Sequence, residues 1–184
     1  MIQMNNNTKS ADTMEHIKTV IRDVPDFPKK GIIFKDITPL LADNASFSGA
    51  IKSLAEKYRG LGITKVLGIE ARGFILAGPI ALELGAGMVP VRKKGKLPYK
   101  TVSATYALEY GEDTLQMHED AVKKGEKVLI VDDVLATGGT AAAVVALVEK
   151  LGGKVEAIAV LIELEFLHGR AKLPGRTVDS LIKY

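Results

Sequence analysis

Two adjacent carboxylates followed by a run of small residues form the pattern with the clearest chemical potential. Asp132 and Asp133 come after a short apolar stretch, and Ala136–Gly139 then leads to Thr140. Residues this small let several backbone N–H groups converge on one anion, and a helix that begins near Thr140 would add the positive end of its dipole. The hydroxyls of Thr137 and Thr140 can also donate hydrogen bonds. The pattern favours a phosphate site.

The carboxylates add a second chemistry to that site. Asp132 and Asp133 suit the cis hydroxyls of a ribose and the water molecules around Mg²⁺. Neither the G-x-x-x-x-G-K-[ST] pattern of a P-loop nor the G-x-G-x-x-G pattern of a dinucleotide site occurs in the chain. A cradle for ribose 5-phosphate therefore explains the whole run Val128–Thr140. A plain glycine turn after an acidic strand end is the alternative for its last four residues alone.

Positive charges gather in two other segments. Arg72 and Gly73 follow an apolar run and precede a predicted helix, so that the guanidinium and nearby N–H groups can hold diphosphate oxygens. Five cations fall within nine residues, enough to compensate a group with several negative charges: Arg92, Lys93, Lys94, Lys96 and Lys100. The alternatives for these lysines are a solvated loop or a nucleic-acid patch, and the second lacks a recognition helix and a series of aromatic platforms.

Strands that alternate with helices are expected to position these loops. Apolar periodicity predicts helices at about 13–22, 44–59, 73–84 and 139–151, and strands at 65–69, 88–92, 128–131 and 154–162. This order indicates an α/β fold, a mainly parallel sheet with helices on both faces, whose ligands gather beyond the carboxyl ends of the strands. The polar segment 93–127 holds two alternating stretches, 101–109 and 113–117, which predict a flexible hairpin flap outside the sheet.

Length and composition indicate an ordinary globular protein. The chain has 184 residues, 47% hydrophobic and 26% charged, which predicts a single domain over 13–184 behind a mobile tail, 1–12. The net charge of +3 is too small to attract nucleic acid over the whole surface. The nearly uncharged stretch 73–91 contains Glu83 and two prolines, which favours a buried helix and strand over a membrane span.

Cysteine and histidine usage bounds the location and the metal chemistry. The chain contains no cysteine, so it has no disulfide framework and no thiolate metal site. Together with an amino terminus unlike a signal peptide, this favours the cytoplasm. His16, His118 and His168 lack metal-ligand spacing, and no residue is assigned as a direct metal ligand.

The run VDDVLATGGT resembles the phosphoribosyl-diphosphate signature of type I phosphoribosyltransferases, and its wording is similar to the adenine-using members. Four further segments match that family in order: Pro25–Leu41, Glu70–Phe74, Arg92–Pro98 and Ala104–Gly111. The resemblance covers about residues 17–184. It implies a type I phosphoribosyltransferase fold and a purine-salvage reaction in which adenine displaces pyrophosphate from 5-phosphoribosyl 1-diphosphate to give AMP.

The resemblance also implies a role for each loop. The ribose would lie against Asp132 and Asp133, its 5′-phosphate against Ala136, Thr137, Gly138, Gly139 and Thr140, and the pyrophosphate against Arg72, Gly73, Arg92, Lys93 and Lys96. Residues 25–41 would recognise the base, with Phe34 as an apolar wall and Lys35 beside it. Glu109, in the flap 93–127, would move a proton on the base. Mg²⁺ would arrive bound largely through the diphosphate and water, and the enzyme would be a homodimer without nucleic-acid or membrane partners.

Several alternatives stay open at this stage. Glu109 has the sequence context of a plain turn charge, and Phe34 that of a core residue. Lys30 stands where the family commonly has proline, and Lys35 where arginine also occurs, which weakens the inference about the base. The rival functions are a phosphoribosyltransferase for hypoxanthine and guanine, xanthine or orotate, or a regulator that kept the fold to sense 5-phosphoribosyl 1-diphosphate.

Overall fold

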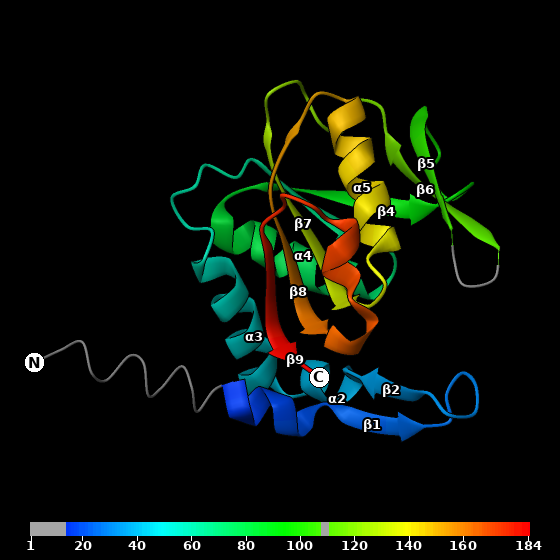
Figure 1. Cartoon of the computed structure of the whole chain (residues 1–184). Coiled ribbons are helices and arrows are strands. Elements are labelled where there is room, and N and C mark those ends of the chain that lie inside the picture. Colours follow the sequence, from blue (N-terminus) through cyan, green and yellow to red (C-terminus); the bar gives the residue numbers. More distant parts are fainter. Residues whose placement is uncertain (1–13, 108–110) are drawn as a thin grey trace, which may run out of the picture. The chain divides into compact units, whose positions relative to one another are not determined.

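The structure, a computed structural model, describes residues 14–107 and 111–184 (Figure 1). It forms two compact units, one up to Ser53 and the other Leu54–Tyr184, and the division falls inside helix α3 (Asn44–Glu56). The sequence-based prediction of one domain over 13–184 stays a prediction, and the tail 1–12 lies outside the described residues.

The first unit contains a small antiparallel hairpin between short helices. Residues 14–20 are helical, and β1 (Arg22–Pro25) pairs with β2 (Ile33–Asp36) so that Val24 opposes Phe34. Helix α2 (Thr38–Ala42) follows at once, with proline in its first turn, where a missing N–H costs nothing. The two strands and α2 did not figure in the sequence analysis, because four or five residues are too few to show a period.

A mainly parallel seven-stranded sheet forms the second unit, in the order β5-β6-β4-β3-β7-β8-β9. Its parallel part consists of β4 (Gly87–Lys93), β3 (Lys65–Ile69), β7 (Lys127–Leu135), β8 (Lys154–Glu163) and β9 (Val178–Lys183). The predicted hairpin is β5 (Thr101–Ala107) with β6 (Glu112–His118). It extends the sheet instead of standing outside it, because β6 pairs antiparallel with the end of β4.

Helices α4 (Arg72–Leu84) and α5 (Gly139–Lys150) cover opposite faces of this sheet, as predicted. Gly68 points at Ala77 of α4, since a Cβ on Gly68 would lie 2.8 Å from the Ala77 side chain. Leu67 and Ile69 point the other way and share a buried cluster with residues of α5. Successive side chains of β3 point to opposite faces of the sheet, so this one strand contacts both helices.

Most strand and helix ends lie within one or two residues of the predicted ones, although the first helix ends at residue 20 and Arg22, predicted to be helical, begins β1. Two further differences are larger. β7 continues four residues beyond Val131, so that Asp132 and Asp133 lie within the strand and not after it. Helix α3 ends at Glu56 instead of residue 59, because its last turn tightens into i→i+3 hydrogen bonds from the N–H groups of Tyr58 and Arg59. Short 3₁₀ turns, η1 (Glu165–Leu167) and η2 (Gly169–Lys172), connect β8 to β9.

Candidate functional site

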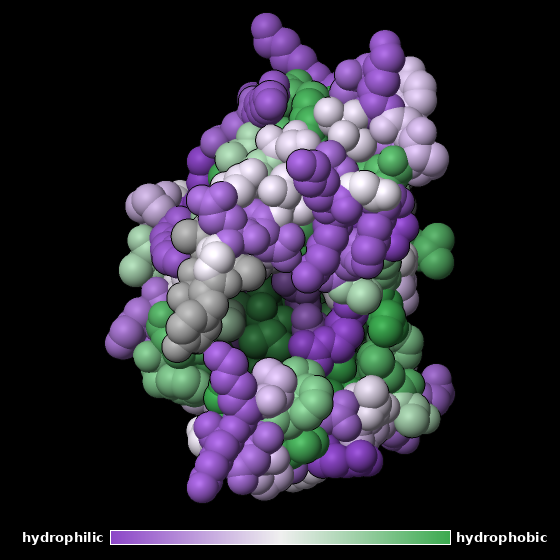
Figure 2. All heavy atoms as spheres, turned by 90° about the vertical axis from the view of Figure 1, so that its right-hand side faces the viewer, coloured by the Kyte–Doolittle hydropathy of each residue, from purple (hydrophilic) through white to green (hydrophobic). Residues whose placement is uncertain are grey.

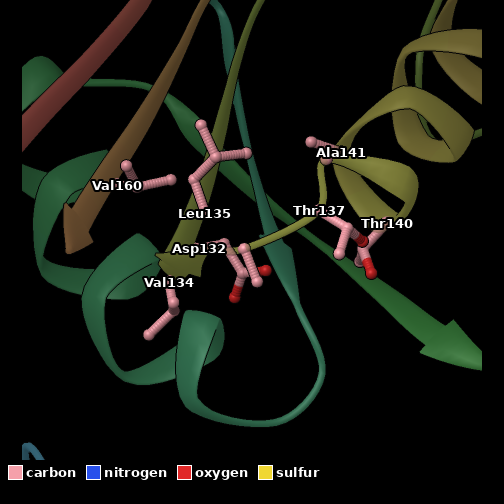
Figure 3. A pocket seen from close by; sticks show the side chains of 9 residues that line it. Asp132, Val134, Leu135, Thr137, Thr140, Ala141 and Val160 are labelled. Atoms are coloured by element: carbon pink, nitrogen blue, oxygen red, sulfur yellow. The ribbon is translucent and has the colours of Figure 1, made fainter. Parts of the chain in front are cut away.

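The predicted phosphate loop joins the end of β7 to the start of α5. Gly138 has a φ of 79°, a conformation that glycine adopts without steric cost, and its carbonyl accepts the first helical hydrogen bond, from Ala142, at 3.0 Å. The loop lines a cavity of about 60 Å³ together with Asp132. Figure 3 shows Asp132, Thr137 and Thr140 projecting to one side of this loop while Leu135 points to the other. Polar side chains and the apolar side chains of Val134, Leu135, Ala141 and Val160 both line the cavity, which adjoins the loop that the sequence analysis assigned to phosphate.

The two carboxylates of β7 meet a cation from the neighbouring loop. Arg72 Nη2 lies 2.7 Å from Asp133 Oδ2, and the Asp133 side chain is buried. Burial and the adjacent Asp133 carboxylate raise the pKa of Asp132 well above its ordinary value, while the charge of Arg72 acts in the opposite direction. A cation or a hydrogen-bond donor placed beside Asp132 would favour its ionised form.

Gly73 makes the approach of α4 to β7 possible. A Cβ at Gly73 would lie 3.0 Å from both Asp132 Oδ1 and the carbonyl oxygen of Val131. The first turn of α4, with the N–H groups that no helical carbonyl accepts, thus sits directly against the acidic pair. The start of α4 and the end of β7, which are far apart in the sequence, come together here because β3 and β7 are neighbouring parallel strands.

A buried carboxylate organises the basic loop that follows β4. Glu70 accepts hydrogen bonds from the backbone N–H of Lys93 at 2.9 Å and from Arg92 Nε at 3.3 Å, and it is also paired with Lys96 Nζ. Arg92 donates in turn to the carbonyl of Lys96 at 3.0 Å. The positive groups of this loop are therefore fixed around one acidic residue, and hydrophilic side chains predominate on the hairpin side of this unit (Figure 2).

Glu70 is a residue that the sequence analysis did not assign. Burial opposes its ionisation, but the hydrogen bonds from Lys96 and from the N–H of Lys93, with the nearby positive charges, outweigh this and hold its pKa below the ordinary value. The segment EARGF contained the signal, because an acidic residue at the end of one parallel strand faces the end of the next.

The remaining lysines of the basic run differ in their surroundings. Lys93 Nζ forms an ion pair with Asp113 of β6 at 3.1 Å, and a hydrogen bond from the Lys93 side chain to Asp113 raises the pKa of Lys93. Lys94 and Lys100 are exposed. The arrangement places Arg92 and Lys96 at Glu70 and turns the Lys93 side chain toward the hairpin.

Two predicted residues of base recognition lie in the first unit. Phe34 packs edge to face on Phe27, with ring centroids 5.2 Å apart, and Lys35 Nζ lies 2.6 Å from Asp23 Oδ1. Both belong to the hairpin of β1 and β2. Their part in binding a base stays a prediction, as does the role of Glu109, which lies outside the described residues.

Comparison with known proteins agrees with this geometry. Residues 37–178 match the family described as phosphoribosyl transferase domain. The chain belongs to the phosphoribosyltransferase family. It is 59% identical to adenine phosphoribosyltransferase of Geotalea daltonii over 171 residues, which cover 93% of this chain and all of that protein.

Solved phosphoribosyltransferases have the same fold. The crystal structure of adenine phosphoribosyltransferase from Rhodothermus marinus superimposes with a TM-score of 0.91 at 54% identity, covering 95% of this chain and 99% of that one. The Saccharomyces cerevisiae enzyme, complexed with D-2,5-dideoxy-2,5-imino-altritol 1,6-bisphosphate and adenine, gives 0.88 at 39% identity, over 93% and 99% of the two chains. The predicted phosphoribosyltransferase fold is thereby confirmed.

Two further properties concern metals and membranes. Among the described residues, no group of three or more histidine, cysteine or acidic side chains is arranged to hold a metal ion. Within the same part of the chain, no helix has both the length and the apolar character needed to cross a bilayer.

Proposed function

We propose that this chain is an adenine phosphoribosyltransferase: it transfers the 5-phosphoribosyl group from 5-phosphoribosyl 1-diphosphate to adenine and releases AMP and pyrophosphate. The observation that carries the proposal is the meeting of Arg72, Asp132 and Asp133 beside a phosphate loop, in a chain 59% identical to a named adenine phosphoribosyltransferase. In this proposal the loop, the acidic pair and the cations bind the phosphate, the ribose and the diphosphate respectively.

Each group of residues has a task in this reaction. N–H groups of Ala136–Thr140 bind the 5′-phosphate at the amino end of α5. The carboxylates of Asp132 and Asp133 accept hydrogen bonds from the ribose hydroxyls and oppose the positive charge that develops on the ring. As the bond from the anomeric carbon to the diphosphate oxygen breaks and a bond to the adenine nitrogen forms, Arg72, Arg92 and Lys96 stabilise the departing negative charge.

Positioning explains why little covalent chemistry is required of the protein. Arg72 is held by Asp133, and Arg92 and Lys96 are held by Glu70, before any substrate binds. Little reorganisation of these cations is therefore needed as negative charge develops on the pyrophosphate. The adenine nitrogen attacks from the face opposite the leaving group, and the anomeric configuration inverts.

The donor set fits Mg²⁺ brought in with the diphosphate. Asp132 and Asp133 provide oxygen ligands of the kind that Mg²⁺ prefers, and they would hold it through its bound water molecules. When bound, the ion neutralises part of the diphosphate charge.

Glu109 is the residue proposed to accept the proton that adenine loses. Glu109→Ala should lower kcat by about 10²–10⁴-fold while 5-phosphoribosyl 1-diphosphate still binds, and Glu109→Gln should lie between this variant and the wild type. Single-turnover rates and AMP affinity, measured on the same preparation, separate a chemical defect from a binding defect. A near-wild-type single-turnover rate in Glu109→Ala would remove Glu109 from the catalytic residues.

The decisive test of function is direct. Purified protein, Mg²⁺ and 5-phosphoribosyl 1-diphosphate are mixed with adenine, hypoxanthine, guanine, xanthine or orotate singly, and nucleotide formation is followed. AMP from adenine at a kcat/KM well above that of the other bases is expected. A higher kcat/KM with another base would mean that adenine is not the substrate. If no base gave a nucleotide, the result would instead favour a sensor of 5-phosphoribosyl 1-diphosphate.

Assembly as a homodimer in the cytoplasm belongs to the same proposal. Ile75, Leu82 and Met88 are exposed on α4 and the adjoining strand, and Leu82 is 84% exposed. An apolar stripe of this kind is suited to a second copy of the chain. Light scattering should give twice the chain mass, and Leu82→Glu should shift the protein toward the monomer. A wild-type protein of single mass would refute the dimer.

A further inference from the structure

The turn that follows β8 touches the phosphate loop backbone to backbone. A Cβ on Gly138 would lie 2.1 Å from the carbonyl oxygen of Gly169, and a Cβ on Gly169 would lie 2.2 Å from the carbonyl oxygen of Ala136. Both distances are far below any contact that a side-chain carbon makes. The two main chains therefore lie against each other with no space for a side chain, and η2 borders the amino end of α5 (Figure 1).

Arg170 makes the most extensive side-chain contacts between this turn and the neighbouring strands. Arg170 donates to both oxygens of Glu163, from Nε at 2.6 Å and from Nη2 at 2.7 Å, and its Nη1 donates to the carbonyl of Val178 at 2.8 Å. Ser180 Oγ donates to Glu163 Oε2 at 2.6 Å. A bidentate pair with a buried carboxylate fixes direction as well as distance, so the turn is tied to the ends of β8 and β9.

The same carboxylate stands beside the strand that leads into the loop. Glu163 is the sheet partner of Leu135, and the N–H of Leu164 donates to the carbonyl of Leu135 at 3.0 Å. Pairing with β8 therefore fixes the point at which the loop leaves β7. The loop then contacts Gly169 through Ala136 and Gly138, and at Gly139 it continues into helix α5.

We propose that Gly169 and Arg170 are positioning residues for the phosphate loop. The turn holds the carbonyl of Ala136 and the backbone of Gly138 where the following N–H groups converge on the 5′-phosphate. This inference rests on the proposed function, and it assigns part of phosphate recognition to residues that make no contact with the phosphate. A turn with only a stabilising role would affect the melting temperature without selecting among ligands.

Gly169→Ala isolates the contact. Gly169 does not have a positive φ, so alanine is compatible with its backbone conformation. The added Cβ meets the Ala136 carbonyl and, at 3.1 Å, Leu135 Cγ, both in the segment that leads into the phosphate loop. Ligand affinities are measured by calorimetry for ribose 5-phosphate and, separately, for Mg²⁺-pyrophosphate. We expect the affinity for ribose 5-phosphate to fall by about 10²-fold, the usual effect of an ångström-scale displacement in a preorganised site. The affinity for pyrophosphate should change less than about twofold, since its cations lie on other loops.

Arginine variants test the second half of the proposal. Arg170→Met should weaken ribose 5-phosphate binding in the same selective way, and Arg170→Lys should restore part of it because one donor group remains. The matched control is Arg176→Met, which removes an arginine–glutamate pair to Glu149 at the other end of α5 and should leave both affinities unchanged.

Selective loss of ribose 5-phosphate affinity in Gly169→Ala supports the proposal, and this result stands even if the Arg170→Met variant does not fold. Unchanged affinities, or equal losses for both ligands, in a folded Gly169→Ala protein would overturn it. The wild-type base assay is separate, so that failure of the proposed reaction is distinguishable from failure of this inference.

Discussion

Replacement of Glu163 by glutamine should make the folded protein less stable in a way that depends on pH. Hydrogen bonds from Arg170 come first among the causes that lower the pKa of Glu163 from 4.5 to about 2, with burial opposing them and Ser180 adding to them. A difference of this size corresponds to about 3 kcal/mol of folding free energy. Because the Arg170 side chain is 44% exposed, solvent screening reduces the expected value to about 2 kcal/mol.

The sign follows from the direction of the pKa change. A carboxyl group whose pKa is depressed in the folded state stabilises that state fully above its unfolded pKa, and the contribution is lost as the pH falls toward the folded pKa. The free energy of unfolding of Glu163→Gln should therefore lie about 2 kcal/mol below that of the wild type at pH 7. The gap should narrow below pH 4.5 and fall to about half near pH 3.

Urea denaturation of both proteins at a series of pH values between 7 and 2.5 measures this gap. Glu149→Gln is the control, because its carboxylate is 48% exposed and pairs with Arg176 at the surface, where such pairs contribute about 0–1 kcal/mol. A gap between Glu163→Gln and the wild type that stays constant across the whole range would refute the electrostatic reasoning and leave only a loss of packing.

Three further variants probe the site itself. Asp132→Asn with Asp133→Asn should lower kcat/KM by about 10²–10³-fold, the scale for loss of a charge-stabilising group, with the folded fraction in circular dichroism largely kept; collapse of the fold with turnover retained in the folded fraction would make the pair structural. Gly138→Val should abolish AMP binding in calorimetry, because a branched residue at a φ of 79° meets the Gly169 carbonyl; unchanged affinity would show that the loop binds no phosphate. Glu70→Ala should raise the KM for 5-phosphoribosyl 1-diphosphate by about 10–10²-fold and leave the KM for adenine unchanged, and equal changes in both would contradict its role as an anchor.

The central strands and their helices were predictable because their sequences are apolar and because glycines follow the helices. The predicted 65–69 coincides with β3, and α4 starts one residue before its predicted start. β7 was predicted too short, since a period of apolar side chains stops at Asp132, whereas backbone pairing with β8 does not depend on side-chain polarity. β9 escaped the sequence analysis because Asp179 and Ser180 interrupt its apolar pattern.

The candidate site was predictable where its residues are contiguous in the chain. The acidic pair and the phosphate loop lie within one run of thirteen residues, which carries its own chemistry. The acidic residue in EARGF marked Glu70 as a strand-end group, but its partners in the basic loop follow from the order of the strands. The role of Gly169 depends on a contact between two loops that no local pattern reveals. A glycine in the sequence indicates that the backbone can adopt unusual conformations. It does not identify the carbonyl group that packs where a side chain would otherwise lie.

The close approach of Gly138 to the Gly169 carbonyl, and of Gly169 to the Ala136 carbonyl, also restricts how this sequence can evolve. Most overpacked positions can be rescued by trimming a neighbouring side chain, but here each obstacle is a main-chain oxygen that every amino acid carries. No compensating substitution at the partner position can make room for a larger residue. In a library randomised at both positions, the two glycines should be recovered together or not at all, and the diversity of the phosphate loop is then bounded by a residue beyond the following strand.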